Sequence, residues 1–491
     1  MNSKQILAIY HRVTSQKSSP VTPQFTKEYS KITKLKCVSV ADAAFGDSGK
    51  GAIAAKLNTI LSRKKKLISL GPNGGANAGH ETSAFGKLVV THHMPIAVIQ
   101  PGATAVITRG KVIHPSDLVS EMDHIKKQFG TTKLPGKLII DERVFLSLDT
   151  HRAFEAALNS VSVGGRGSTA RGIATSYADI YLRIALSMRD LLNPNWKNIF
   201  KNHYLLYQKL LKGFGGEYED MENVWVTSFG KDKKKVGSEK EFLERLSVAR
   251  EKIKPFVIST MYSFLKGAWS DPQKIFTIEF AQAAGLDPYH GVYPDVTSSR
   301  PLTRSIGDST YGVIEYEDIS LSLGVTKTIY ISSVGIRKLP TQLSTNRAST
   351  IRSEQNEFGK STGRPRDVYE ISLPILRYLR RADGYTNLAA THLDAATQSE
   401  AIGVVTHYTD KKTGRELPYL PYQDYLDRLK PHIVEFPGWD GHALKDVKNL
   451  KDLPREASQY LSFLSQTVAP VALATTGPEV EEYLSWIPGL S

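Results

Sequence analysis

Apolar and polar positions near the start of the chain change between strand-like and helix-like patterns. Residues 38–41 form a short apolar run, residues 45–51 are rich in glycine, and residues 52–61 carry apolar side chains at helical spacing. Residues 66–70 form a second apolar run of strand length. Since short buried strands that alternate with helices are typical of α/β proteins, this pattern predicts an α/β fold.

Residues 193–255 have a different pattern. They are rich in lysine and interrupted by several glycines, which predicts a peripheral helical insertion rather than a part of the central sheet. The chain has 491 residues, of which 41% are hydrophobic. It is therefore long enough for one large α/β unit with subdomains.

The first 36 residues are basic and polar, with the single acidic residue Glu28. We expect residues 1–36 to be a flexible extension and residues 37–491 to form one folded domain. A transit peptide would normally hold more arginine, so we expect a cytoplasmic protein, with organelle targeting by the extension left open.

Charge and cysteine content narrow the class of protein. Lysine and arginine number 63 against 49 acidic residues, a net charge of +14, which suits partners that carry phosphate. The basic runs at 63–66 and 233–235 have no aromatic residues between their lysines, so they read as solvated surface and nucleic acid is an unlikely partner. Cys37 is the single cysteine, which excludes an internal disulfide and a thiolate zinc site. No apolar stretch approaches the ~20 residues of a membrane span.

Two glycine-rich loops follow the two predicted strands. The first contains Lys50 and lies between a strand and a helix, an order that brings backbone amides against phosphate. It departs from the standard P-loop, because Ala44 and Gly51 stand where that motif needs glycine and serine or threonine. The second loop, residues 71–80, combines glycines with asparagines and ends at His80, a composition that suits close approach of backbone to a ligand.

These loops resemble the opening signature of the adenylosuccinate synthetase family, which reads Gly-Asp-Glu-Gly-Lys-Gly and then Asn-Ala-Gly-His. Further segments resemble the family's motifs in the same order: residues 167–173, 279–282, 293–299, 356–366, 393–394, 437–439 and 476–478. The resemblance covers about residues 37 to 480. It implies a large, mostly parallel central β-sheet flanked by helices, with peripheral helical subdomains.

The implied reaction joins L-aspartate to the 6-oxo position of IMP, with GTP as co-substrate, through a 6-phosphoryl intermediate. The resemblance gives Asp47 the role of the base at N1 and of a ligand to Mg²⁺, with the Gly79 carbonyl as a second ligand. His80 is implied to stabilise the migrating phosphoryl group, and Lys50 to neutralise phosphate charge.

The resemblance also implies the binding residues. Those for GTP are Gly46, Gly49, Gly51, Asp394, Thr476 and Gly477. Those for the purine monophosphate are Asn77, Thr169, Arg183, Gln282 and Thr297, and those for aspartate are Thr362, Arg364 and Arg366. A carboxylate can accept hydrogen bonds from guanine N1 and the 2-amino group, whereas adenine has no such donor pair, so Asp394 favours GTP over ATP. Arg183, expected on a helix over residues 177–192, is implied to reach the neighbouring subunit's site, which predicts a homodimer with shared active sites.

Several positions depart from the family pattern and keep alternatives open. They are Ser48, Ala52, Glu81, Pro365, His392 and the segment 300–302. One alternative is a relative that acts on GMP or dGMP and makes 2-aminoadenylosuccinate, and another is a purine-nucleotide-binding regulator without catalysis. In the viral enzymes that use a guanine nucleotide the catalytic aspartate is typically lost, so the presence of Asp47 favours IMP.

Overall fold

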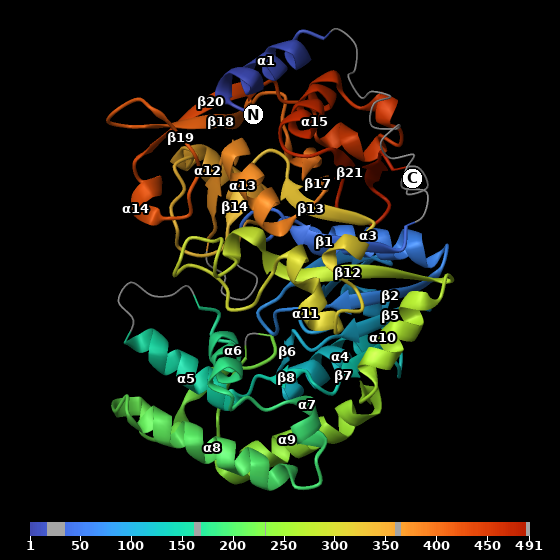
Figure 1. Ribbon diagram of the computed structural model, residues 1–491, viewed down its shortest axis with the longest axis vertical. Coiled ribbons are helices and arrows are strands. Elements are labelled where there is room, and N and C mark those ends of the chain that lie inside the picture. Colours follow the sequence, from blue (N-terminus) through green and yellow to red (C-terminus); the bar gives the residue numbers. More distant parts are fainter. Residues whose placement is uncertain (17–34, 162–167, 231, 359–364, 488–491) are drawn as a thin grey trace.

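A large twisted sheet forms the centre of the protein in the computed structural model, which describes residues 1–16, 35–161, 168–230, 232–358 and 365–487 (Figure 1). In spatial order its strands are β11 (Val257–Ile258), β7 (Lys137–Asp141), β5 (Thr104–Ile107), β2 (Lys66–Gly71), β12 (Lys274–Ala283), β1 (Cys37–Asp42), β13 (Leu321–Lys327), β17 (Asn387–Thr391), β21 (Val471–Thr475) and β22 (Tyr483–Ser485). Each neighbouring pair is parallel except the last, β21 with β22.

Helices and small sheets surround this centre. The helices include α3 (Lys50–Ser62), α4 (Pro115–Phe129), α5 (Asp149–Ser160), α10 (Met261–Ser270), α11 (Ile306–Thr310), α12 (Thr345–Glu354), α13 (Leu373–Asp383), α14 (Gln423–Leu426) and α15 (Arg455–Thr467). The outer strands include β3 (His80–Ala84), β4 (Lys87–Thr91), β6 (Val112–Ile113), β8 (Phe145–Leu146), β14 (Ile331–Ser333), β15 (Asp367–Tyr369), β16 (Ile371–Ser372), β18 (Ile402–Asp410), β19 (Glu416–Leu417) and β20 (Leu429–Phe436). The predicted α/β class and the mostly parallel sheet are confirmed, as are the strands at 38–41 and 66–70 and the helix at 52–61.

The carboxyl ends of the parallel strands determine where chemistry can occur. Strands β1, β2, β12, β13, β17 and β21 run in one direction, so all of them end at the same edge of the sheet. The two glycine-rich loops follow β1 and β2 at this edge, and Asp394 and Thr476 follow β17 and β21. In open α/β sheets this edge is where ligands bind.

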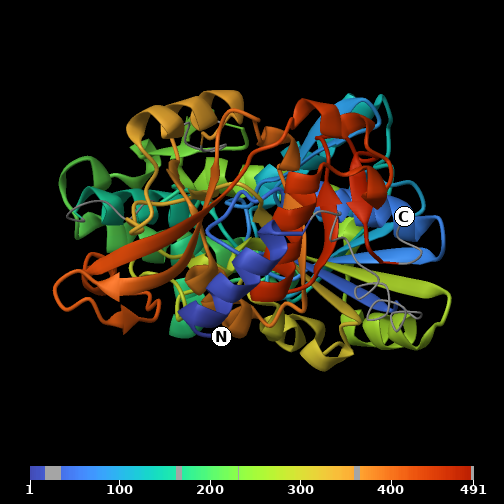
Figure 2. The same ribbon diagram turned by 90° about the horizontal axis from the view of Figure 1, so that it is seen from above.

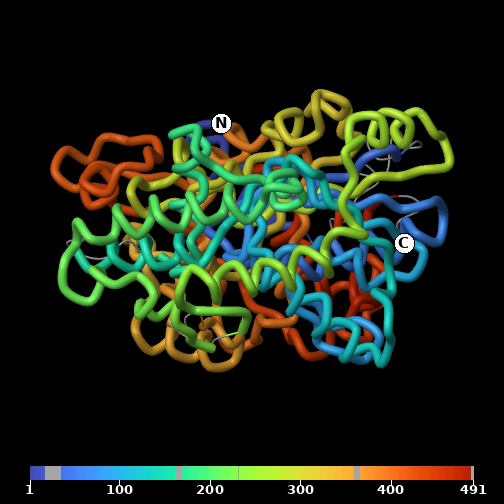
Figure 3. Tube along the Cα trace, turned by 90° about the horizontal axis from the view of Figure 1, so that it is seen from below, coloured from blue at the N-terminus to red at the C-terminus, as the bar shows by residue number. Residues whose placement is uncertain are grey.

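The segment 193–255 forms a separate layer at one end of the molecule, drawn in green in Figures 1 and 3. It contains α8 (Trp196–Lys212), β9 (Trp225–Thr227), β10 (Lys233–Lys235) and α9 (Glu239–Ile253). Helix α8 buries one face through Phe200, Tyr204 and Leu211, while its other side carries lysines. The segment lies far from α1, at the opposite end of the view in Figure 1.

The N-terminal helix α1 (Ser3–Thr14) differs from the flexible extension that the sequence predicts for residues 1–36. Asn2 caps the helix, and Ile6 and Val13 are buried. The ring of Tyr10 makes an edge contact with Phe436, at 5.2 Å between centroids. Figure 2 shows the helix lying across the molecule beside α15. Residues 17–34 lie outside the described residues.

The lengths and apolar content of the helices bear on membrane insertion. Among the residues that the structure describes, none of the helices is both long enough and apolar enough to cross a bilayer.

Candidate active site

The first glycine-rich loop is held by a carboxylate at the end of β1. Asp42 accepts hydrogen bonds from the backbone N–H groups of Ala44 and Ser48, at 2.9 and 3.1 Å, and from the Ser48 hydroxyl at 2.6 Å. Asp47 lies in the left-handed region with φ 55°, a conformation that costs energy and is often found at functional sites. Gly49, with φ 86°, caps the start of α3, so the helix N-terminus faces outward at this loop.

The second loop brings His80 to the same place. A Cβ atom on Gly51 would lie 2.7 Å from the backbone nitrogen of Glu81, so only glycine lets α3 approach β3 this closely. His80 Nδ1 bonds to Glu279 on β12, while His80 Nε2 is buried without a hydrogen-bond partner among the described residues. Burial lowers the pKa of His80, which favours the neutral ring.

A cavity of about 500 Å³ opens above these loops. The predicted site residues that line it are Asp47, Gly49, Lys50, Gly51, Gly79, Arg366, Asp394 and Gly477. The structure therefore brings Asp47 and Gly79, assigned to the metal, close to several residues assigned to GTP and to Arg366, one of those assigned to aspartate. Gly46 is buried behind the loop.

A chain of charged groups runs along one wall of this cavity; we call it the cavity network, and it consists of Lys327, Glu357, Arg366 and Asp47. Glu357 bonds to the Lys327 ammonium and accepts a 2.7 Å hydrogen bond from Arg366 Nη1. Arg366 Nη2 lies 2.5 Å from the Asp47 carboxylate. Burial opposes the ionisation of Glu357, but Lys327 and Arg366 outweigh it and lower the pKa of Glu357 to about 2.

Arg366 keeps donor capacity for a ligand. Its Nε is buried and has no hydrogen-bond partner among the described residues. Because an unpaired buried donor is costly, this atom suits an acceptor such as a carboxylate. Thr362 and Arg364, the other residues assigned to aspartate, lie outside the described residues.

The opposite end of the cavity is formed by the loops after β17 and β21. Asp394 follows β17, and burial raises the pKa of its carboxyl group. Thr476 and Gly477 follow β21, and the Thr476 hydroxyl is buried without a partner among the residues that the structure describes. His392 lies between them on the cavity wall, and burial lowers its pKa to about 3, so the ring is neutral.

A third group of loops meets beside the cavity. Asn73 Nδ2 donates to the Ala281 carbonyl and to the Ser299 hydroxyl, both at 3.1 Å. The Tyr177 hydroxyl bonds to the Gly74 backbone nitrogen at 3.2 Å. Three side-chain atoms assigned to the purine monophosphate are buried with no partner in the described part of the chain: Asn77 Oδ1, Gln282 Nε2 and Thr297 Oγ1. Thr169 is partly buried in the loop that leads into α6 (Ile173–Leu182).

Arg183 is not part of this group. The helix predicted over 177–192 is wrong as a single element, because α6 ends at Leu182 and a new helix, α7 (Met188–Leu192), begins later. Arg183 takes a left-handed conformation just after α6, and its side chain is exposed. Tyr181 and Leu182 beside it are also exposed, at 78% and 64%.

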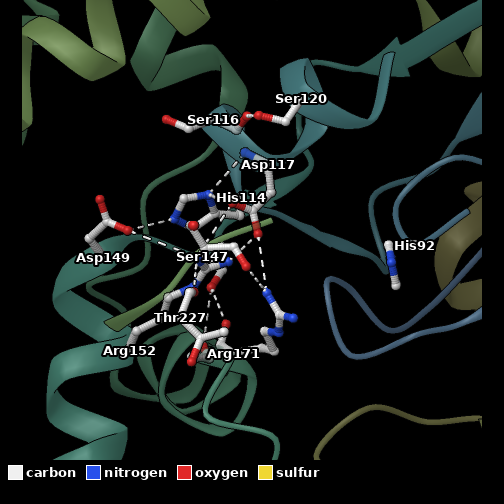
Figure 4. Close-up of polar contacts among 12 residues, drawn as sticks. His92, His114, Ser116, Asp117, Ser120, Ser147, Asp149, Arg152, Arg171 and Thr227 are labelled. Atoms are coloured by element: carbon white, nitrogen blue, oxygen red, sulfur yellow. Dashed lines mark hydrogen bonds and ion pairs between the residues drawn. The ribbon is translucent and has the colours of Figure 1, made fainter. Parts of the chain in front are cut away.

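A second set of charges lies below the loop that carries Thr169; we call it the closed network, and it consists of His114, Asp117, Asp149, Arg152 and Arg171 (Figure 4). His114 Nε2 donates to Asp149 at 3.2 Å, and Arg152 Nη2 bonds to Asp117 at 2.6 Å. Arg171 donates to backbone carbonyls of the segment 228–230. The network thus attaches the segment 193–255 to the loop before α6.

Sequence reasoning missed several groups that hold the site. Asp42, Lys327 and Glu279 were given no role, although Asp42 and Lys327 end apolar strands at the carboxyl edge of the sheet and Glu279 lies within β12 near that edge. A polar residue at the end of a buried strand was the signal that could have identified the first two.

Comparisons with known proteins agree with this geometry. The family model for adenylosuccinate synthetase matches residues 39–484. The adenylosuccinate synthetase of Bdellovibrio bacteriovorus is 32% identical over 458 residues, which covers 92% of this chain and 98% of that protein.

Two solved structures share the fold. The fully ligated adenylosuccinate synthetase of Plasmodium falciparum superposes with a TM-score of 0.78 at 25% identity, over 91% of this chain and 99% of that one. The succinoaminodeoxyadenylate synthetase of cyanophage S-2L, bound to dGMP and dATP, has a TM-score of 0.53 at 15% identity, over 92% and 95% of the two chains, and shows likeness of fold alone. The match of the family model across nearly the whole chain shows that the protein belongs to the adenylosuccinate synthetase family of GTP-dependent ligases.

Proposed function

We propose that the protein condenses IMP with L-aspartate at the expense of GTP, forming adenylosuccinate, GDP and phosphate. The observation that carries the proposal is the contact between Asp47 and Arg366, at 2.5 Å, beside the N-terminus of α3. It joins the candidate base, the candidate aspartate-binding arginine and the phosphate-facing helix in one cavity.

The reaction needs a base and a phosphoryl donor because oxide is a poor leaving group. Asp47 takes the N1 proton of IMP, which makes O6 nucleophilic toward the γ-phosphorus of GTP. Aspartate nitrogen then attacks C6 and phosphate leaves with the former O6. His80 Nδ1–H donates to Glu279, and His80 Nε2 is unpaired in the described structure. When the ring takes up a second proton, Nε2–H donates to the migrating phosphoryl group, while Lys50 balances the charge of the phosphates.

The donor set also fits Mg²⁺, which prefers oxygen ligands. The Asp47 side chain is 31% exposed, and the surroundings of Gly79 are open enough that no atom lies within 4 Å of where a Cβ would stand. Asp47 and the Gly79 carbonyl would hold the ion, which supplies charge neutralisation for the phosphates.

The three substrates occupy three parts of the site. GTP places its phosphates along Gly46, Gly49 and Gly51 and its guanine at Asp394, Thr476 and Gly477. IMP lies against Asn77, Thr169, Gln282 and Thr297, and aspartate against Arg366 with Thr362 and Arg364. The unpaired polar atoms at Asn77, Gln282 and Thr297 support the second of these assignments.

Exposed residues at the carboxyl end of α6 support a shared site in a homodimer. Arg183 projects beside the exposed Tyr181 and Leu182, which are unusual on a free surface. In the proposed dimer the guanidinium of Arg183 meets the 5′-phosphate of IMP in the neighbouring subunit, because a planar donor fork suits phosphate.

A substrate panel tests the reaction. IMP, dIMP, GMP and dGMP are each incubated with aspartate and either GTP or ATP, and the product is measured by chromatography. We expect product with IMP and GTP only when all three substrates are present. Turnover confined to guanine monophosphates contradicts the proposal, and so does phosphate release that needs no aspartate.

Mixing two inactive variants tests the shared site. We expect Asp47→Asn and Arg183→Leu each to be inactive alone, whereas a heterodimer holds one site with both residues intact. Recovery of activity after subunit exchange is the expected result. Exchange without recovery, shown by a tagged subunit, rejects the shared site.

A further inference from the structure

Lys56 is a charged residue in a fully buried position. It lies on α3, its exposed fraction is 0%, and its neighbours on the helix include the buried Ile53, Leu57 and Ile60. Burying an ammonium group costs free energy unless acceptors surround it. Burial lowers the pKa of Lys56 to about 8, although Glu482 opposes the shift.

The acceptors of Lys56 are two backbone carbonyls from the far end of the chain. Its Nζ donates to the carbonyl of Glu479, and to that of Glu482 at 3.4 Å. The same Nζ lies 5.9 Å from the ring centroid of Tyr483. Lys56 therefore connects α3 to the turn over residues 476–482.

This turn is built by its own hydrogen bonds. The Thr476 backbone nitrogen donates to the Glu482 carbonyl at 3.0 Å, and the Glu479 nitrogen donates to the Glu482 carboxylate at 2.9 Å. A Cβ on Gly477 would lie 2.3 Å from that carboxylate, so the turn closes tightly around glycine. A bridge between Ser83 and Glu479 attaches its outer side to β3.

The turn and the helix meet different parts of one ligand. The N-terminus of α3 contributes Lys50 and Gly51 to the lining of the cavity, and the turn contributes Gly477 and Pro478 to the lining of the same cavity. The distance between the phosphate and base subsites is thus set by the joint between α3 and the turn. We propose that Lys56 is a positioning residue that fixes the guanine-binding turn relative to the phosphate-binding helix. This inference rests on the proposed function.

Packing alone does not explain a lysine here. Methionine has a similar length and would fill the space without desolvating a charge. Replacing a buried ionic side chain by an apolar one of similar volume is often neutral or stabilising. What methionine cannot do is donate to the carbonyls of Glu479 and Glu482. The lysine is accordingly useful for the geometry of the turn rather than for the stability of the core.

Binding of GDP to the full-length protein tests the inference, because it does not depend on turnover. Calorimetry compares wild type with Lys56→Met, and steady-state kinetics give KM for GTP, IMP and aspartate. We expect the dissociation constant of GDP and the KM of GTP to rise about tenfold, with the other two KM values within about twofold and no fall in melting temperature.

Lys111→Met is the matched control. Lys111 is also a buried lysine, at 2% exposure, and burial likewise lowers its pKa to about 8, but its charge acts on Glu279 and Glu121. Its GDP affinity should stay within about twofold of wild type. An unchanged GDP affinity in Lys56→Met overturns the inference, as does an equal loss in both variants.

If Lys56→Met does not fold, a second variant changes the turn itself. Glu482→Ala removes the carboxylate that accepts from the Glu479 nitrogen and leaves α3 intact. It should weaken GDP binding about fivefold, and an unchanged affinity overturns the inference. Wild-type protein that binds GDP but forms no adenylosuccinate would reject the proposed function and leave the role of Lys56 standing.

Discussion

The cavity network and the closed network contain the same kinds of side chain but differ in access to ligands. In the cavity network the Asp47 carboxylate is 31% exposed, whereas in the closed network the Asp117 and Asp149 carboxylates are 3% and 5% exposed. Perturbed pKa values do not separate the two. The pKa of Glu357 is low, and the pKa values of Asp117 and Asp149 are held well below the usual range against the effect of burial.

The partners of the charges explain the difference. Asp149 forms an ion pair with Lys234 at 3.0 Å and accepts from Arg245 at 3.3 Å, so its charge is matched by residues of the segment 193–255. Asp47 forms an ion pair with Arg366 and lines the cavity. A buried charge matched by protein indicates assembly of the fold, while a charge open to a cavity indicates chemistry.

Removal of the Asp47 charge should give the largest effect on activity. Asp47→Asn loses the base and a metal ligand, so turnover falls by about 10² to 10⁴-fold, the usual contribution of a general base. The melting temperature should remain within a few degrees, because the side chain is partly exposed. Product formation and differential scanning calorimetry measure the two effects, and near wild-type turnover would refute the assigned chemistry.

Removal of a closed-network charge should lower the stability of the protein and leave substrate binding nearly unchanged. Asp149→Asn removes the negative charge that Lys234, Arg245 and His114 share, and breaking a buried ion pair costs about 3 to 5 kcal/mol. The free energy of unfolding should fall by this amount, as measured by urea titration of tryptophan fluorescence, with KM for IMP and aspartate nearly unchanged in the folded protein.

The exposed pair of Asp123 with Lys252 provides the control for that comparison. Asp123→Asn should cost about 0 to 1 kcal/mol, as surface ion pairs do. If Asp149→Asn instead abolished turnover in a protein of normal stability, the division between the two networks would be wrong.

Arg366 tests the aspartate end of the cavity network. Arg366→Leu should raise KM for aspartate about 10 to 100-fold, the loss expected for hydrogen bonds to a charged group, with a smaller change in KM for GTP. Glu357→Gln should shift the same constant less, about fivefold, since Glu357 acts through Arg366.

The double variant shows whether the two residues act together. Residues in one network have non-additive effects, so Arg366→Leu with Glu357→Gln should resemble Arg366→Leu alone. Arg347→Leu, an arginine that pairs with Glu370, serves as the control. Full additivity would mean that Glu357 does not act through Arg366.

Local patterns predicted the elements around the site, and contacts between distant segments account for what they missed. Strands β1 and β2 and helix α3 follow from apolar spacing, and the resemblance placed Asp47, Lys50 and Arg366 in one cavity. Helix α1 was missed because its apolar side becomes informative only when α15 covers it. The joint at Lys56 depends on Glu479 and Glu482, more than 400 residues away, which no local pattern reveals.

The last prediction concerns the pH dependence of the closed network. Burial, with Arg152 beside it, lowers the pKa of His114 to about 4 against an ordinary value of 6.5. As pH falls from 6.5 to 4 the unfolded chain therefore takes up this proton before the folded protein does, and stability is lost across that window. His114 Nδ1 accepts from the Asp117 nitrogen at 3.3 Å while Nε2 donates to Asp149, so the neutral ring satisfies both contacts.

Replacing His114 removes the uptake of this proton on unfolding between pH 6.5 and 4. In His114→Asn the dependence of the free energy of unfolding on pH should be shallower by about 1.4 kcal/mol per pH unit, the value for one proton, between pH 6.5 and 4. Urea titrations at intervals of half a pH unit measure the slope. His124, which is not part of the closed network, provides the control, and His124→Asn should leave the slope as in wild type. An unchanged slope in His114→Asn would mean that the proton is taken up elsewhere and that His114 does not couple the closed network to pH.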